Sequence, residues 1–162
     1  MTKPQPPKAN IGLDEKKKKA IVDLLQHLLA DEYVLTTATK GAHWNVSGIH
    51  FSELHKFLEK QYQLLSEITD EVAERVLQLG YKAETVIGTY LKLTRLKDEA
   101  ALGTAEELIK GLVDKQETLI RELRKDIDTI EDKYEDKGTS DFLTGVMEKH
   151  EQMAWMLRVH LA

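Results

Sequence analysis

The chain has 162 residues, of which 41% are hydrophobic and 31% are charged, and its formal net charge is −5. This length suits one domain with an apolar core, and the acidic balance argues against a nucleic-acid surface that covers the whole body. The chain contains no cysteine, which excludes disulfides and thiolate metal sites and fits a reducing cytoplasm.

The first residues of the sequence lack an apolar core of the signal-peptide type. No uninterrupted apolar stretch approaches the ~20 residues that a membrane helix needs. All three prolines lie within residues 1–12, and this segment predicts a flexible N-terminal tail. We therefore expect a soluble, cytoplasmic protein in which residues 13–162 form one helical domain.

Helical spacing of apolar residues begins soon after this tail. Asp14 is a candidate N-cap for a first long helix, whose apolar residues recur at helical intervals from Ile21 onward. Ser47 and Gly48 interrupt the pattern. A second periodic segment spans residues 51–79 and is followed by Gly80, a usual helix terminator.

The connection formed by residues 81–103 is long, and residues 83–94 are apolar enough for a short extra helix. Thr104 and Glu107 form a capping box that opens a third helix, with apolar residues through Ile130. A fourth helix is expected after Gly138, with Thr139 or Ser140 as its cap, and it continues through Leu161.

Four long helices with one long connection between the second and third predict an all-α four-helix bundle with a crossover. Ferritin-like folds have this plan, with the ligands of their metal sites carried on facing helices. Unrelated proteins share the plan, so function has to be argued from particular side chains.

The side chains that carry chemistry are two histidines and three carboxylates within or beside the second helix: His43, His55, Glu59, Asp70 and Glu74. Imidazole and carboxylate together suit a divalent metal such as iron. His55 and Glu59 are four residues apart, as are Asp70 and Glu74, so each pair projects from one face of the helix. His27, His50, His150 and His160 have no carboxylate at a matching spacing, and we expect them to be structural or surface residues.

The two pairs cannot share one ion within a single chain. His55 and Asp70 are fifteen residues apart, or roughly 22 Å along a straight helix, whereas metal–ligand bonds are about 2 Å. They could meet if a second copy of the helix ran antiparallel across a two-fold axis near Tyr62–Gln63. The spacing therefore predicts a metal site between subunits and an obligate oligomer.

The run His43-Trp44-Asn45-Val46-x-Gly48-x-x-Phe51-x-x-x-His55, followed by Asp70-x-x-Ala73-Glu74-Arg75, resembles the signature of the Dps family. These are small ferritins known as DNA-binding proteins from starved cells. The segment Thr139-x-Asp141-x-Leu143-Thr144 and the last helix around Trp155 also resemble that family. The resemblance covers about residues 14–161.

The resemblance implies a hollow homododecamer with a ferroxidase site at each two-fold interface. There Fe²⁺ is oxidised by hydrogen peroxide or oxygen and stored as ferric mineral, which protects against oxidative stress. The family's ligands fall on His43 and His55 of one subunit and on Asp70 and Glu74 of its neighbour. A further acidic ligand, commonly Asp in the family, falls on Glu59, which adds a methylene. The implied cofactor is a di-iron centre, in which zinc or another divalent metal can substitute.

Two further features fit such a protein. Trp44 is beside the predicted ligands and could supply or quench an electron, although a core aromatic is the simpler interpretation. In the family, aspartates near the end of the third helix and the start of the fourth line negative pores through which ions enter. Asp132 and Asp141 are the closest matches, with Asp136 next. The alternative for these aspartates is a solvated helix end.

The alternative function is that of a nucleoid protein which binds DNA without sequence preference. It would use the only basic cluster, which consists of Lys3, Lys8, Lys16, Lys17, Lys18 and Lys19. Phosphate contacts of this kind are sensitive to salt. The net negative charge and the interrupting prolines make DNA a less favoured partner than iron. A third alternative, a bundle without chemistry, is opposed by the presence of the four principal ligands.

Overall fold

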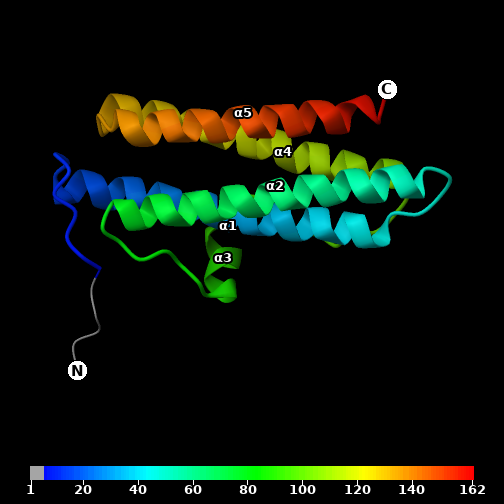
Figure 1. Cartoon of the computed structure of the whole chain (residues 1–162), viewed down its shortest axis with the longest axis horizontal. Coiled ribbons are helices and arrows are strands. Elements are labelled where there is room, and N and C mark those ends of the chain that lie inside the picture. The colour runs from blue at the N-terminus through cyan, green and yellow to red at the C-terminus, as the bar shows by residue number, and fades with distance from the viewer. Residues whose placement is uncertain (1–5) are drawn as a thin grey trace.

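The computed structural model describes residues 6–162 and shows a bundle of four long helices with one short helix at its side (Figure 1). The elements are α1 (Glu15–Asn45), α2 (Phe51–Gln78), α3 (Ile87–Leu93), α4 (Ala105–Asp128), the π-helical turn η1 (Thr129–Lys133) and α5 (Lys137–Val159). Helices α1 and α2 form one hairpin and α4 and α5 form another, while α3 lies in the crossover against α1. The predicted fold class is confirmed.

Local signals set most helix ends as the sequence indicates. The Asp14 side chain caps α1 by accepting from the Lys17 amide at 2.8 Å. Thr104 and Glu107 form the predicted capping box on α4, and the backbone N–H of Thr104 lowers the pKa of the Glu107 carboxyl. Gly80 follows α2 with φ of 86°, a conformation that favours glycine.

The start of the last helix differs from the prediction. Its cap is Asp136, whose carboxylate accepts from the Thr139 amide at 3.2 Å, so α5 begins before Thr139 and includes Gly138. The chain reverses at Glu135, which has a φ of 57°, and this turn brings the carboxylate of Asp136 to the helix end. Carboxylates are good cap acceptors. A Cβ at Gly138 would lie 3.1 Å from the Arg75 guanidinium, so glycine leaves room for that group.

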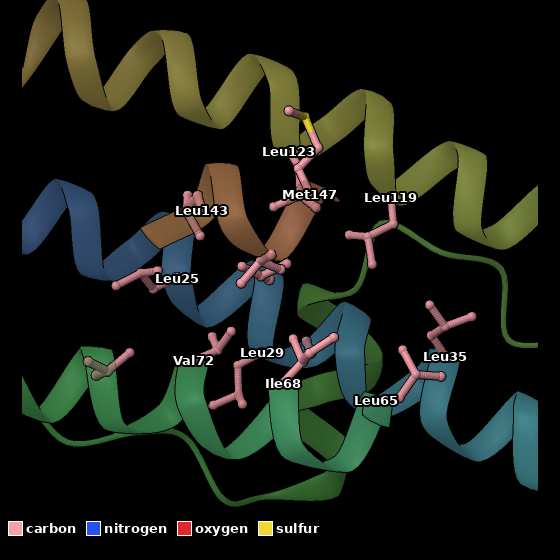
Figure 2. Close-up of a cluster of buried hydrophobic side chains, with 14 of the residues drawn as sticks. Leu25, Leu29, Leu35, Leu65, Ile68, Val72, Leu119, Leu123, Leu143 and Met147 are labelled. Carbon is pink, nitrogen blue, oxygen red and sulfur yellow. The ribbon is translucent and has the colours of Figure 1, made fainter. Parts of the chain in front are cut away.

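Apolar side chains from both hairpins meet between the four long helices (Figure 2). Figure 2 shows α1 contributing Leu25 and Leu29, α2 Ile68 and Val72, and α4 and α5 Leu123 and Leu143, all directed inward. Each fully buried side chain of this kind contributes about 1.5–3 kcal/mol to folding relative to an exposed one. None of the helices within residues 6–162 is long and apolar enough to cross a bilayer.

A buried polar triad crosses this core and joins the two hairpins. It consists of Glu32 on α1, Gln116 on α4 and His150 on α5, which are exposed by 0%, 1% and 0%. The His150 ring bonds the Gln116 side chain through Nδ1 at 2.7 Å and the Glu32 carboxylate through Nε2 at 2.7 Å. Buried polar groups require such partners, so these three side chains fix the register of α1 against α4 and α5.

The crossover is attached to the bundle by Arg95. Its guanidinium pairs with Asp31 on α1 at 2.7 Å and with Asp126 on α4 at 2.7 Å. Burial opposes the charge of Arg95, but the two carboxylates outweigh it and raise the pKa of the guanidinium. Burial raises the pKa of Asp126 against the lowering effect of Arg95. The crossover is therefore anchored to both hairpins.

We predict that His150→Ala lowers the free energy of unfolding by about 3–5 kcal/mol, because it leaves the Glu32 carboxylate buried without its partner. Urea unfolding followed by circular dichroism, at one fixed protein concentration, measures the change. His50→Ala is the matched control, because His50 is exposed. Equal stability of the two variants would show that the triad contributes nothing to the fold.

Candidate functional site

The two predicted histidine ligands lie face to face where α1 ends and α2 begins. The His43 and His55 rings are stacked, with centroids 3.7 Å apart and planes 21° from parallel. His43 Nδ1 bonds the backbone oxygen of His55 at 2.8 Å, and His55 Nδ1 bonds the backbone oxygen of His43 at 2.9 Å. The structure thus brings these two residues together through reciprocal contacts with the main chain.

The positions of these two carbonyls in their helices explain why they accept the imidazoles. The carbonyl of His43 lies in the last turn of α1, where four carbonyls lack a partner within the helix. The carbonyl of His55 lies inside α2, and a carbonyl oxygen has a second lone pair free for another donor. Both imidazoles therefore satisfy backbone acceptors and are held at a fixed orientation.

The same contacts determine which ring nitrogen is free. A carbonyl oxygen can only accept, so Nδ1 of each histidine carries the proton. In the neutral ring Nε2 is then unprotonated and has a lone pair for a metal ion. Histidine ligands in metal sites usually donate their other ring N–H to a carbonyl or carboxylate in this way. The pair has the form expected of two neutral imidazole ligands.

Aromatic side chains pack around the histidines. Phe51 lies against His55 with centroids 5.0 Å apart, and the Tyr62 and His43 rings form a T-shaped pair with centroids 5.3 Å apart and planes at 71°. His43 is only 7% exposed. Trp44, in contrast, is 68% exposed and is not a core aromatic of the single chain. Its redox role stays a prediction.

The three predicted carboxylate ligands follow along one uninterrupted helix. Glu59 is half-buried one turn after His55, whereas Asp70 and Glu74 are exposed near the other end of α2. Because α2 is continuous from Phe51 to Gln78, His55 and Asp70 are separated by roughly 22 Å. Within residues 6–162 no three His, Asp or Glu side chains of one chain converge closely enough to hold a metal ion.

The predicted ion entrance divides into exposed and engaged aspartates. Asp132 and Asp141 are exposed. Asp136 is 7% exposed, caps α5, accepts from the Thr139 hydroxyl and lies 3.7 Å from the Arg75 guanidinium. The charge of Asp136 is therefore already compensated within the chain. Asp132 and Asp141 keep their charges available to ions.

The predicted basic cluster is partly engaged in the same way. Lys18 is 2% exposed, and its ammonium donates to the backbone oxygen of Ala9 at 2.7 Å and pairs with Glu15 at 2.6 Å. The Lys17 ammonium pairs with Glu135. Lys8, Lys16 and Lys19 are exposed, and Lys3 lies outside the described residues.

Residues 6–12 have no regular secondary structure, yet they are not without contacts. In addition to the bond from Lys18, the backbone of Ala9 and Pro7 passes so close to Gly80 that a Cβ there would lie 3.0 Å from the Ala9 nitrogen. This part of the predicted tail is therefore packed against the ends of α1 and α2.

Neither the place of Tyr62 beside the site nor the reciprocal backbone contacts were predicted from the sequence. Tyr62 follows Glu59 by three residues, so it shares a helix face with that carboxylate. This spacing was a usable signal. The backbone contacts left no signal in the sequence, because they depend on how α1 and α2 pack together.

Comparison with known proteins gives a consistent result along the chain. The ferritin-like domain family matches residues 22–162. A low temperature-induced protein of Nostoc that is itself uncharacterized is 44% identical over 154 residues, which is 94% of this chain and 86% of the relative. The DNA protection during starvation protein 2 of Bacillus anthracis is 34% identical, covering 88% of this chain and 97% of the relative.

Solved structures point to the same ferritin-like relatives. The Dps protein of Vibrio cholerae, described as a member of a broad superfamily of ferritin-like diiron-carboxylate proteins, superposes with a TM-score of 0.89 at 30% identity. The match covers 99% of this chain and 100% of that one.

We predict that His43 and His55 carry their proton on Nδ1 at pH 8 in the absence of metal. Solid-state NMR of protein with ¹⁵N-labelled histidine distinguishes the two nitrogens by chemical shift. The exposed His50 provides the comparison, because it has no fixed acceptor. Protonated Nε2 on either ligand would contradict the arrangement described above.

Proposed function

The chain belongs to the Dps family of ferritin-like proteins, and on this premise we propose that it is a ferroxidase and iron-storage protein. It oxidises Fe²⁺ with hydrogen peroxide or oxygen and stores the ferric product as mineral inside a hollow homododecamer. Residues 13–162 are the ferritin-like domain, and the protein acts in the cytoplasm, where it limits oxidative stress. The stacked histidine pair with both Nε2 atoms available is the observation that carries the proposal.

The proposed iron site is shared between two subunits. His43 and His55 of one chain face Asp70 and Glu74 of a second chain, with Glu59 as an additional ligand. Exposure of Asp70 and Glu74 in the single chain supports this arrangement, since they are available to a neighbour. Their separation from His55 along α2 supports it as well, because no bending of a continuous helix would bring them together.

The residues suit the chemistry of iron oxidation. Neutral imidazoles bind Fe²⁺ well, and carboxylates are hard ligands that favour Fe³⁺. Two Fe²⁺ ions give one electron each, so that H₂O₂ with two protons becomes two molecules of water and no hydroxyl radical is released. The few protein ligands leave coordination positions for the oxidant. The proposal includes a redox role for Trp44, which follows His43 near the end of α1 and would give or quench an electron in an incomplete reaction.

If the site is shared, two variant subunits that lack different ligands should form one intact site when they assemble together. We predict that His43→Ala/His55→Ala and Asp70→Asn/Glu74→Gln assemblies each lose rapid peroxide-driven iron oxidation. When the two variants are unfolded, mixed in equal amounts and reassembled, roughly a quarter of the sites should be intact, because half of the two-fold pairs are mixed and each contains one complete site. Stopped-flow absorbance of the ferric product measures the recovery.

The control is each variant taken through the same unfolding and reassembly alone. Light scattering verifies that all samples form shells. No recovery on mixing would place all the ligands in one subunit, and full activity in either variant alone would place the oxidation elsewhere.

We further propose that Asp132 and Asp141 guide iron to the interior. Both are exposed near the junction of η1 and α5, and copies of them around a symmetry axis would form a negative ring. Rings of carboxylates raise the local concentration of cations. Asp136 is expected to attract iron less strongly, because its carboxylate already interacts with Arg75 and with the N-terminus of α5.

We predict that Asp132→Asn/Asp141→Asn slows mineralisation by about tenfold at low ionic strength, and that salt reduces the difference. The substitutions remove charge while keeping volume, so they test electrostatics. Iron uptake is followed by absorbance at low and high salt, with Asp114→Asn on α4 as the matched control. Wild-type uptake at both salt concentrations would mean that these aspartates are solvated charges at a helix end with no role in iron entry.

A primary role in DNA binding is the second proposal, and it has weaker support. Of the basic residues that would contact phosphate, Lys17 and Lys18 are engaged within the chain. Lys8, Lys16 and Lys19 are exposed and available. DNA binding by these residues would be independent of the iron ligands.

A further inference from the structure

Tyr62 on α2 lies between two of the proposed iron ligands. Its hydroxyl points to the Glu59 Oε1 atom at 3.5 Å, which is longer than the usual O–H···O hydrogen bond of about 2.5–3.0 Å. Its ring forms a T-shaped pair with the imidazole of His43, with centroids 5.3 Å apart. The ammonium of Lys40 lies over the same ring, 5.3 Å from its centroid. One side chain thus contacts both the histidine half and the carboxylate half of the site in a single chain.

We propose that Tyr62 is a positioning residue that holds the carboxylate of Glu59 for metal binding; this inference rests on the proposed ferroxidase function. The phenol O–H is the donor and the carboxylate is the acceptor. A carboxylate that accepts this bond on Oε1 keeps Oε2 and its remaining lone pairs for a metal ion. Such outer contacts orient ligands, and their loss typically weakens metal affinity by about 10–100-fold.

The length of Glu59 makes such a tether necessary. Glutamate has one more rotatable bond than aspartate, so an untethered Glu59 would populate several carboxylate positions and lose more rotamer freedom on binding a metal. Glu59 and Tyr62 are three residues apart on one helix, a spacing at which side chains are neighbours. The phenol can therefore reach the longer side chain without any change in the backbone.

Tyr62 is itself fixed by α1. The edge of an aromatic ring is its positive part and favours the face of another ring, while a cation favours the ring face. The contacts with His43 and Lys40 use both features, and both residues lie on α1. The position of Glu59 is thereby linked to the packing of α1 against α2.

The test is Co²⁺ binding to the full-length assembled protein without oxidant, followed by isothermal titration and by Co²⁺ absorption. The di-iron centre of the proposed function offers two positions for Co²⁺ in each site. Tyr62→Phe should weaken binding at the position that Glu59 helps to hold by about 10–100-fold and leave binding at the position held by the histidines unchanged. Tyr33→Phe is the matched control, because Tyr33 is on the exposed side of α1 and contacts Tyr90 rather than the site.

Repeating the Tyr62→Phe substitution in a Glu59→Asp variant separates a positioning role of Tyr62 from a general effect on the fold. Glu59→Asp shortens the carboxylate beyond reach of the phenol, so Tyr62→Phe should have little further effect in that background. An equal loss of affinity in both backgrounds, or wild-type binding by Tyr62→Phe, would overturn the inference.

His43→Ala/His55→Ala provides the remaining comparison. If it keeps full Co²⁺ binding, the proposed iron site is wrong and the inference fails with it. If it loses binding while Tyr62→Phe does not, only the inference fails.

Discussion

The contact on which the arrangement of this bundle depends is the buried triad of Glu32, Gln116 and His150. Apolar side chains can slide past one another at modest cost, but the triad can be satisfied at only one register of the hairpins. A shift by one helical turn would leave a carboxylate, an imidazole and an amide buried without partners, which is expensive in a medium of low polarity. Since α1 carries both Glu32 and His43, the register set in the core also determines where the histidine lies.

A second set of polar contacts lies at the end of α1. The rings of His43 and His55 bond to each other's main chain, and this fixes the position of the side chains and the tautomer together. The His43 carbonyl is one that the fold has to satisfy in any case, because a helix end leaves carbonyls without partners. The His55 carbonyl lies inside α2 and accepts the second imidazole through its other lone pair. The contacts that stabilise the α1–α2 connection therefore also leave two Nε2 atoms with free lone pairs, as the proposed iron site requires.

On the proposed function, the division of ligands between chains follows from the stiffness of α2. A helix that runs from Phe51 to Gln78 keeps Asp70 and Glu74 at a fixed distance from the histidines. Each chain then carries two incomplete half-sites, and assembly completes both at once across a two-fold axis. Iron oxidation would depend on assembly, which would keep the reaction within the closed shell where the product is stored.

The sequence by itself determined the four long helices, the short helix in the crossover, the caps at Asp14 and Thr104, and the residue types on which the proposed iron site rests. These features depend on periodicity and on side chains within one turn of each other, which a sequence displays directly. Even the need for a second subunit could be argued from residue spacing and the rise of a helix.

Only the tertiary structure decided which of these residues are free to act. It placed the cap of α5 at Asp136, whose carboxylate also lies near Arg75 on α2, in a segment far away in the chain. It engaged Lys18 with Ala9, buried His150 and set Tyr62 beside His43. The protonated nitrogen of each histidine was likewise decided by packing, since the acceptor lies on another helix. Contacts of this kind depend on how helices pack, and no local pattern encodes them.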